Sequence, residues 1–280
     1  MKVGLVLEGG GMRGLYTAGV IDIMLDHSFE PDVVCGASAG VTFGINLISK
    51  QRGRVLRYNT RYLKDKRYIS FHSWLTTGNM INRKFAYGEL PVTLDPFDEK
   101  TFEASKAEFY ATITNMHTGQ PEYIKLVNAL EQMEVIRATA ALPVVCQPVE
   151  LNGQKYMDGG VADPIPLDKC LELGCDKIVV VLTHPYSFVR KDKLNFWCRL
   201  LYPRYKNLLR TFDSRNEDYN RRVQQIMQLE QEGKVFVFRP LELLNILRLE
   251  KDPARLEQVY NIGLKDAESK WQALEEYLKS

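Results

Sequence analysis

The stretch Val33-Val34-Cys35-Gly36-Ala37-Ser38-Ala39-Gly40 joins a short apolar run to a serine in the pattern G-x-S-x-G. The apolar run predicts a buried strand, and the small residues Gly36 and Gly40 allow this strand to turn sharply into a helix. Such a turn exposes the Ser38 hydroxyl, which can then act as a nucleophile. A glycine-rich turn with an N-capping serine would give the same pentapeptide, so the assignment depends on the rest of the chain.

A second glycine-rich turn lies close to the N-terminus. Residues 3–7 form an apolar run, the sequence Glu8-Gly9-Gly10-Gly11-Met12-Arg13-Gly14 follows it directly, and an apolar helical pattern occupies about residues 15–25. Backbone N–H groups in such a turn, at the start of a helix, stabilise negative charge. The turn is therefore a phosphate cradle or an oxyanion hole.

Nucleotide binding is one alternative for this turn, because Gly9, Gly11 and Gly14 match G-x-G-x-x-G. That fingerprint also requires an acidic residue at the end of the second strand, whereas Asp32 stands at the start of that strand. A P-loop would require a lysine followed by serine or threonine, which the turn lacks. Consecutive parallel strands would place the turn and Ser38 at the same edge of a sheet, which favours an oxyanion hole.

A third motif, Asp158-Gly159-Gly160, follows a short strand-like run and offers a proton acceptor. Alone, it is typical of a surface Asx-turn. The alternative acceptor is His184, because it follows the strand-like run 177–182 and the order Ser38, Asp158, His184 is that of α/β-hydrolases. The nucleophile of those enzymes usually follows several strands, whereas Ser38 follows only the second. We therefore favour a dyad of Ser38 and Asp158 over a triad.

These motifs, in this order, resemble the bacterial patatin-like phospholipases, lipid acyl hydrolases related to the catalytic domain of cytosolic phospholipase A2. The matching blocks lie between residue 3 and about residue 185 and include the small-residue run 138–143, in which Thr139 replaces a common serine. The resemblance implies an α/β fold of three layers, α/β/α, around a central, mostly parallel sheet. It also implies that Ser38 is the nucleophile and Asp158 the general base and acid.

The same resemblance assigns supporting roles to the glycines of the three motifs. It implies that Gly9, Gly10 and Gly11 donate oxyanion N–H groups, with Arg13 in support. The residues that shape the other two turns are Gly36, Gly40, Gly159 and Gly160. The implied reaction is cleavage of a fatty acyl ester through an acyl-enzyme, of the phospholipase A, lysophospholipase or esterase type, with neither metal nor cofactor. The alternatives are an acyltransferase with the same dyad and a non-catalytic lipid- or nucleotide-binding module.

The composition fits one large α/β domain in the cytoplasm. We expect a catalytic core over residues 1–185 and an extension over 186–280 that packs on it. Five cysteines, an odd number without C-x-x-C, predict neither a disulfide framework nor a metal site. The apolar run 3–7 is too short for a signal peptide, and no run reaches the length of a membrane span.

The charge is close to balanced, with 37 Lys and Arg against 35 Asp and Glu, but it is unevenly distributed. Residues 50–67 and 186–212 are strongly basic, and the second segment also contains seven aromatic residues. Its basic residues are Arg190, Lys191, Lys193, Arg199, Arg204, Lys206 and Arg210. This mixture suits a lid or a peripheral contact with an anionic membrane surface, and the alternative is a solvated helix face with aromatics on the core. No nucleic-acid-binding motif accompanies the charge, and the sequence leaves the oligomeric state open.

Apolar periodicity predicts alternating strands and helices along the chain. Strand-like runs occur at about 3–8, 32–35, 108–114, 122–127, 176–182 and 234–238. Helical patterns occur at about 12–26, 39–64, 129–139, 166–173, 214–232 and 253–279. The runs 111–115 and 123–126 read as a hairpin inserted into the sheet.

Overall fold

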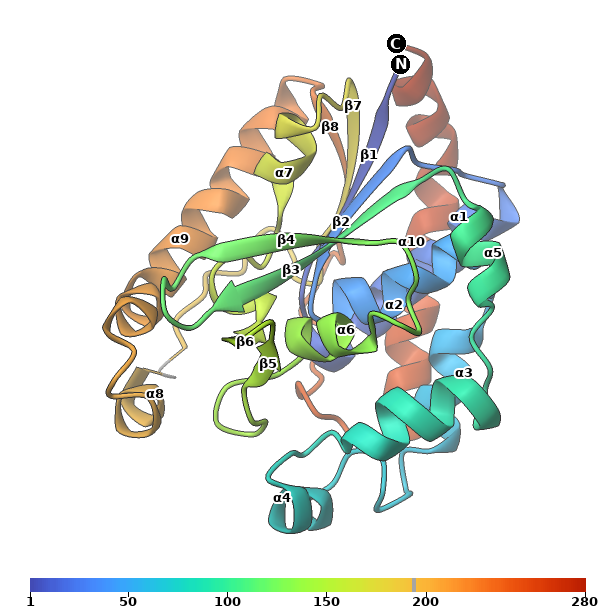
Figure 1. Cartoon of the computed structure of the whole chain (residues 1–280). Helices are drawn as coiled ribbons and strands as arrows, with labels where there is room; N and C mark the ends of the chain where they lie inside the picture. The colour runs from blue at the N-terminus through green and yellow to red at the C-terminus, as the bar shows by residue number, and fades with distance from the viewer. Residues whose placement is uncertain (193–194) are drawn as a thin grey trace.

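The structure is a computed structural model that describes residues 1–192 and 195–280, and its described strands form one mixed sheet (Figure 1). The strand order is β5-β6-β3-β2-β1-β7-β8, with β4 paired to β3. Their bounds are β1 Val3–Leu7, β2 Val33–Ala37, β3 Glu108–Asn115, β4 Pro121–Leu126, β5 Val149–Leu151, β6 Gln154–Asp158, β7 Lys177–Val181 and β8 Val235–Phe238. Strands β3, β2, β1, β7 and β8 pair in parallel, whereas β4, β5 and β6 pair antiparallel.

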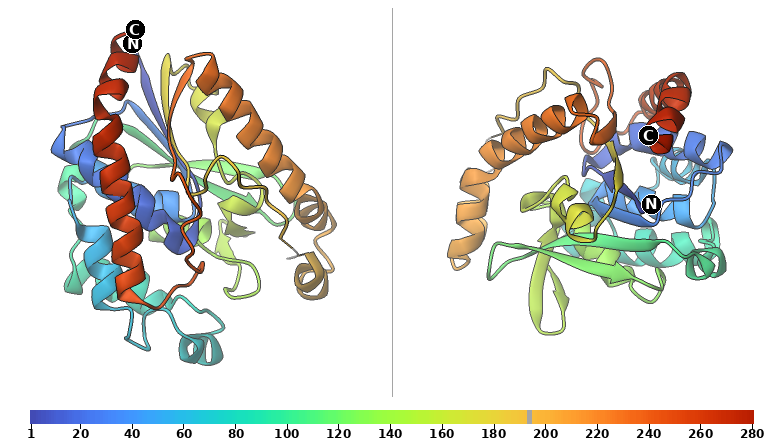
Figure 2. Two further views of the ribbon diagram at one scale, coloured as in Figure 1. Left: turned by 180° about the vertical axis from the view of Figure 1, so that it is seen from behind. Right: turned by 90° about the horizontal axis from the view of Figure 1, so that it is seen from above.

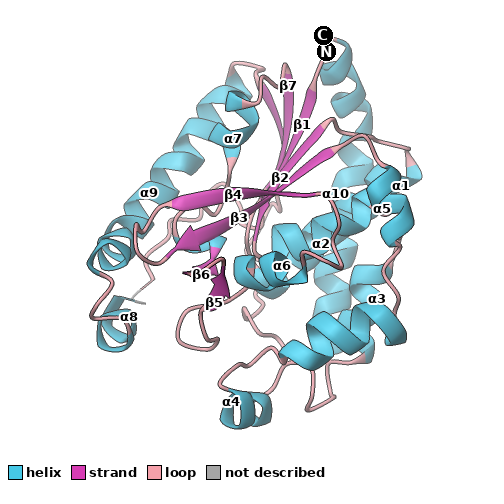
Figure 3. Ribbon diagram, in the orientation of Figure 1, coloured by secondary structure: helices cyan, strands magenta, loops and turns pink. Residues whose placement is uncertain are grey.

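Helices cover both faces of this sheet, which confirms the predicted α/β fold (Figures 2 and 3). One face carries α1 (Leu15–Asp26), α2 (Ala39–Ile48) and α10 (Pro253–Lys279), and the other carries α7 (Leu167–Glu172) and α9 (Lys206–Gln231). Side chains alternate along each strand, so Leu5 and Leu7 join the first core while Val6 joins the second. Each core packs buried strand residues against buried helix residues, which makes the sheet a rigid support for the loops at its edge.

The C-terminal helix α10 packs directly against α1 through two glycines. A Cβ atom on Gly19 would lie 2.2 Å from the Tyr260 carbonyl oxygen, and one on Gly263 would lie 2.1 Å from the carbonyl oxygen of Tyr16. Only glycine allows the two backbones to approach this closely. The crossing brings the two ends of the chain side by side, where Lys177 Nζ donates to Ser280 Oγ (2.8 Å; Figure 1).

The bounds of β1, β2, β3, β4, β7 and β8 agree with the predicted runs to within about two residues. The single helix predicted over 39–64 is wrong, because the chain turns between Ile48 and Arg54. Lys50 and Gly53 have φ angles of 54° and 71° there, which a helix cannot contain. Helix α9 begins at Lys206 rather than near residue 214, and α6 covers Met133–Thr139. The elements that periodicity did not predict are α3 as a separate helix (Arg54–Arg61), α4 (Phe71–Thr77), a π-helix (Phe85–Leu94), α5 (Glu99–Ala104), β5 and α8 (Asn195–Leu201).

The basic and aromatic segment 186–212 contains both buried and exposed side chains. Arg190 and Phe212 are buried, whereas Phe196 and Trp197 on α8 are 68% and 55% exposed. Lys193, one of its expected basic residues, lies outside the described residues. Across residues 1–192 and 195–280, no helix combines the length and the apolar character needed to cross a bilayer.

Candidate active site

Ser38 is the single residue between the end of β2 and the start of α2. Its φ and ψ angles are 52° and −120°, a backbone conformation that residues other than glycine rarely adopt and that is typical of functional sites. The Ser38 N–H donates to the Thr139 hydroxyl (2.9 Å), which donates in turn to the Thr112 carbonyl oxygen on β3 (2.5 Å). Gly40 must be small because a Cβ there would lie 2.3 Å from the Leu7 carbonyl oxygen. These contacts hold the strained turn in place.

The structure brings Ser38 and Asp158 together. Ser38 Oγ donates to Asp158 Oδ2 at 2.7 Å, and the Gly160 N–H donates to Asp158 Oδ1 at 2.7 Å. Both side chains are buried. Burial raises the pKa of Asp158, while the hydrogen bonds from Ser38 and Gly160 and the charge of Arg248 act in the opposite direction. A buried carboxylate with a raised pKa is suited to accept the proton of the serine.

The glycine turn after β1 lies against Ser38, since a Cβ on Gly9 would be 3.2 Å from Ser38 Cβ. The Gly9 N–H donates to the Pro164 carbonyl oxygen (3.0 Å), so it is occupied. The N–H groups of Gly10 and Gly11 take part in none of the hydrogen bonds among the described residues. Of the three expected oxyanion donors, these two therefore remain free to bind a ligand.

His184 lies beside Glu8 rather than beside the Ser38–Asp158 pair. Its Nδ1 is 3.3 Å from Glu8 Oε1, and its ring stacks on Phe188 with 3.9 Å between centroids. Within the described chain, no hydrogen bond links it to Ser38 or to Asp158. Burial lowers the pKa of His184, so the ring is neutral at neutral pH.

Glu8 is a fully buried carboxylate that sequence reasoning did not single out. Besides His184, it accepts hydrogen bonds from the Thr183 N–H (2.5 Å) and the Tyr219 hydroxyl (2.8 Å). Burial alone would raise the pKa of Glu8, but the hydrogen bonds from His184 and Thr183 and the charge of Arg190 lower it to about 2. Glu8 is therefore ionised at neutral pH, and its hydrogen bonds hold the start of the glycine turn in place.

Four arginines surround the glycine turn and the Asp-Gly-Gly turn, and only Arg13 was expected there. Burial and the charge of Arg248 lower the pKa of Arg13 to about 10, so it stays charged at neutral pH. Arg190, Arg215 and Arg248 line the space next to Ser38. Their only signal in the sequence is their charge, because they lie far from the motifs along the chain and are brought in by the fold.

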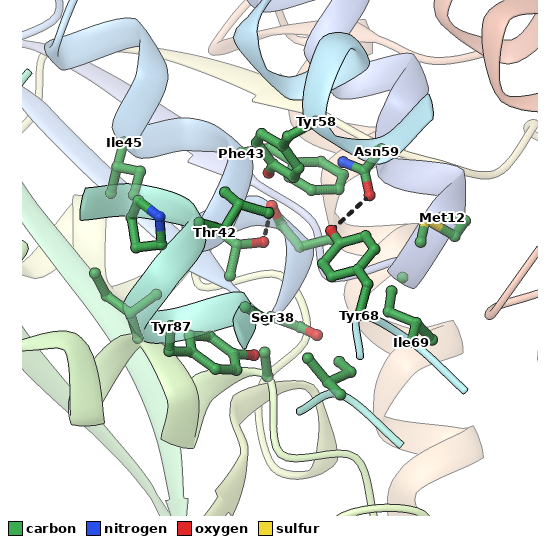
Figure 4. A pocket seen from close by; sticks show the side chains of 18 of the residues that line it. Met12, Ser38, Thr42, Phe43, Ile45, Tyr58, Asn59, Tyr68, Ile69 and Tyr87 are labelled. Carbon is green, nitrogen blue, oxygen red and sulfur yellow. Dashed lines mark hydrogen bonds between the residues drawn. The ribbon is translucent and has the colours of Figure 1, made fainter. Parts of the chain in front are cut away.

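Ser38 also opens into an apolar cavity of about 890 Å³, a volume that includes its mouth. In Figure 4, Ser38 stands at this cavity with Tyr87 on one side and Tyr68 and Ile69 on the other. Further apolar lining comes from Met12, Phe43, Leu90, Phe97, Met133 and Ile136. Such a lining accommodates a hydrocarbon chain and offers it few polar partners.

Comparison with known protein families assigns most of this chain. A family model described as patatin-like phospholipase matches residues 5–171, and a model for a domain of unknown function, DUF6363, matches residues 205–279. The first match covers the glycine turn, Ser38 and Asp158. The chain belongs to the patatin-like phospholipase family.

Two relatives show how this chain compares with longer proteins. It is 30% identical over 190 residues to the uncharacterized protein YjjU of Escherichia coli, covering 66% of this chain and 52% of YjjU. It is 29% identical over 185 residues to lysophospholipase NTE1 of Saccharomyces cerevisiae, covering 64% of this chain and 10% of NTE1. The match thus spans about half of the first relative and a tenth of the second. Among solved structures, VipD from Legionella pneumophila matches 96% of this chain and 67% of its own, with a TM-score of 0.43 and 13% identity.

Proposed function

We propose that this protein hydrolyses fatty acyl esters of lipids, with Ser38 as the nucleophile and Asp158 as the general base. The observation that carries the proposal is the 2.7 Å hydrogen bond from Ser38 Oγ to Asp158 Oδ2, at the wall of an apolar cavity. Membership of the patatin-like phospholipase family supports it, as does the similarity to lysophospholipase NTE1. The activity is of the phospholipase A or lysophospholipase type.

The first half of the reaction forms an acyl-enzyme. Asp158 Oδ2 takes the proton of Ser38 as Oγ attacks the ester carbonyl carbon, and the carbonyl oxygen becomes an oxyanion. The N–H groups of Gly10 and Gly11 stabilise this charge. When the tetrahedral intermediate collapses, the C–O bond to the alcohol breaks and Asp158 returns the proton to the leaving alkoxide.

The second half releases the fatty acid. Asp158 takes a proton from a water molecule, which attacks the acyl carbon of the Ser38 ester. The same N–H groups hold the second oxyanion. Collapse of this intermediate breaks the bond to Ser38 Oγ, and the proton held by Asp158 passes to the serine. One carboxylate thus serves both halves, with no histidine.

We also propose that the protein works at a lipid surface. Figure 1 shows α4 and α8 at the end of the molecule where β1 and β2 finish, and Ser38 directly follows β2. Both helices expose apolar side chains, namely Phe71, Trp74 and Leu75 on α4 and Phe196, Trp197, Leu200 and Leu201 on α8. Aromatic and basic residues together suit the headgroup region of an anionic bilayer. The free cysteines are in keeping with a reducing compartment such as the cytoplasm.

We regard residues 186–280 as an extension that forms one structural unit with the 1–185 core. Two features support this view: β8 continues the sheet by pairing with β7, and α10 crosses α1 at Gly19 and Gly263. The extension also supplies side chains to the space beside Ser38.

Release of free fatty acid by the purified protein tests the proposed function. A panel of phospholipids, lysophospholipids and neutral glycerides is expected to include substrates that the protein cleaves, with the acid and the alcohol as products. Ser38→Ala is expected to abolish release, whereas Ser269→Ala, an exposed serine on α10, is expected to leave it unchanged. Equal release by the Ser38→Ala protein would contradict the proposal.

A further inference from the structure

A second, smaller cavity of about 350 Å³ adjoins Ser38, and its chemistry differs from that of the apolar cavity. It is lined by the glycine turn, Asp158 and three arginines, Arg190, Arg215 and Arg248. Ser38, Gly11, Leu142 and Arg248 line both cavities. Ser38 therefore stands at the junction between an apolar space and a basic space.

Arg190 is held in this cavity by stacking rather than by an ion pair. Its guanidinium carbon lies 3.6 Å from the centre of the Tyr219 ring, and the Tyr219 hydroxyl is fixed by Glu8. The side chain is 4% exposed, yet its Nη1 has no hydrogen-bond partner in the described part of the chain. A buried guanidinium nitrogen without an acceptor is costly to the fold, and an anionic ligand in this cavity would supply the acceptor.

Arg215 on α9 and Arg248 before α10 contact the Asp-Gly-Gly turn and the glycine turn, respectively. Arg215 Nε donates to the Gly160 carbonyl oxygen (3.2 Å). Arg248 lies against Gly11, where a Cβ would be 3.4 Å from Arg248 Cγ. Asp192 is the acidic partner of both, at 3.0 Å from Arg215 and 4.0 Å from Arg248. With Asp158, which also lines the cavity, two carboxylates face the three arginines, and the cavity keeps an excess of positive charge.

We propose that Arg190, Arg215 and Arg248 bind a phosphate group on the alcohol part of the substrate, while the acyl chain occupies the apolar cavity. The inference rests on the proposed function, because it places the scissile ester at Ser38 between the two groups. Guanidinium groups match phosphate oxygens in geometry and charge, and several of them around one anion give selectivity over a neutral group. The substrate class is therefore an acyl glycerol phosphate or a lysophospholipid rather than a neutral glyceride.

A matched pair of substrates tests this assignment. Oleoyl glycerol phosphate and oleoyl glycerol share the acyl chain and the ester and differ only in the phosphate. We expect Arg248→Gln to lower the ratio of kcat/KM for the phosphate ester to kcat/KM for the neutral ester by about 10- to 100-fold. Arg190→Lys, which keeps the charge and loses the planar fork, is expected to lower the same ratio. Arg221→Gln, an exposed arginine on α9, is the matched control and should change neither value.

The outcomes separate the subsite from the catalytic proposal. If Arg248→Gln and Arg190→Lys both keep the wild-type ratio of the two substrates, the phosphate subsite is wrong. It is also wrong if inorganic phosphate slows hydrolysis of the neutral ester while the enzyme does not discriminate between the two esters, because the arginines then bind free phosphate only. If neither ester is cleaved, calorimetric measurement of the binding of both lipids to the Ser38→Ala protein tests the phosphate subsite separately. Tighter binding of the phosphate lipid to Ser38→Ala, lost in the double variant Ser38→Ala/Arg248→Gln, would support the subsite even though the hydrolase proposal fails. Equal binding of the two lipids to Ser38→Ala would overturn the subsite.

Discussion

Ser38 and Asp158 meet although 120 residues separate them, because both are aligned on β3. Ala37, the last residue of β2, pairs with Thr112, and Asp158, the last residue of β6, pairs with Ile113 on the same edge of β3, while β4 occupies the opposite edge. β2 runs parallel to β3 and β6 runs antiparallel to it, so the two ends meet over adjacent residues. The register of β3 therefore sets the 2.7 Å distance between Ser38 Oγ and Asp158 Oδ2.

The pH dependence of hydrolysis should reflect the environment of Asp158. A general base acts when ionised, so kcat/KM is expected to fall as the pH drops through the pKa of Asp158. Burial raises that pKa, which places the midpoint of the acid limb above the usual 3.8. A pH profile of kcat/KM on a substrate without titratable groups checks this, and a limb centred at or below 3.8 would be inconsistent with Asp158 as a buried base.

Thr139 is expected to support the Ser38 turn through its hydroxyl. Thr139→Val removes the acceptor of the Ser38 N–H and the donor to Thr112, and it leaves both groups buried. We expect the free energy of unfolding to fall by about 1–3 kcal/mol and activity to fall with it, because the strained turn loses its support. Thr139→Ser keeps the hydroxyl and should behave like the wild type. Denaturant unfolding and kcat/KM measured on both variants distinguish the hydroxyl from the side-chain volume.

The sequence predicted the parts of this site that depend on short motifs, and it missed the parts that depend on tertiary contact. Apolar runs followed by glycines identified both Ser38 and the turn after β1, because the backbone conformation of these turns requires small residues. Arg215 and Arg248 follow no such rule, since α9 and the loop before α10 bring them to the site from afar. Similarly, apolar periodicity predicted α10, but it did not predict the turn at Gly53 that separates α2 from α3, so it gave one helix over 39–64.

His184 is expected to be dispensable for the chemical step. It contacts Glu8 and Phe188, and it is neutral at neutral pH because burial lowers its pKa. His184→Ala should therefore reduce kcat by far less than the 10²–10⁴-fold that the loss of a general base costs. Assays well below the unfolding temperature separate a loss of turnover from a loss of stability. A kcat reduced to the level of Ser38→Ala would instead assign His184 to the mechanism.

Glu8 is expected to stabilise the fold as an ionised group. Its pKa falls from 4.5 to about 2 in the folded state, so at neutral pH the ionised form contributes about 3 kcal/mol to the free energy of unfolding. This contribution is present above pH 4.5 and is lost as the pH falls through about 2. Urea unfolding of Glu8→Gln and wild type between pH 7 and pH 2 should show a difference that disappears at low pH. Glu217→Gln, an exposed position on α9, is the control, and a pH-independent Glu8→Gln difference would contradict the argument.

The most direct test of the Ser38–Asp158 dyad is the rate at which a fluorophosphonate labels the protein. We expect a single adduct on Ser38 in the wild type, no adduct in Ser38→Ala, and a rate constant at least about 10³-fold lower in Asp158→Asn, because the serine then lacks its base. His184→Ala, measured beside them, should be labelled at a rate close to that of the wild type. Labelling of Asp158→Asn at the wild-type rate, or an adduct on a residue other than Ser38, would contradict the dyad.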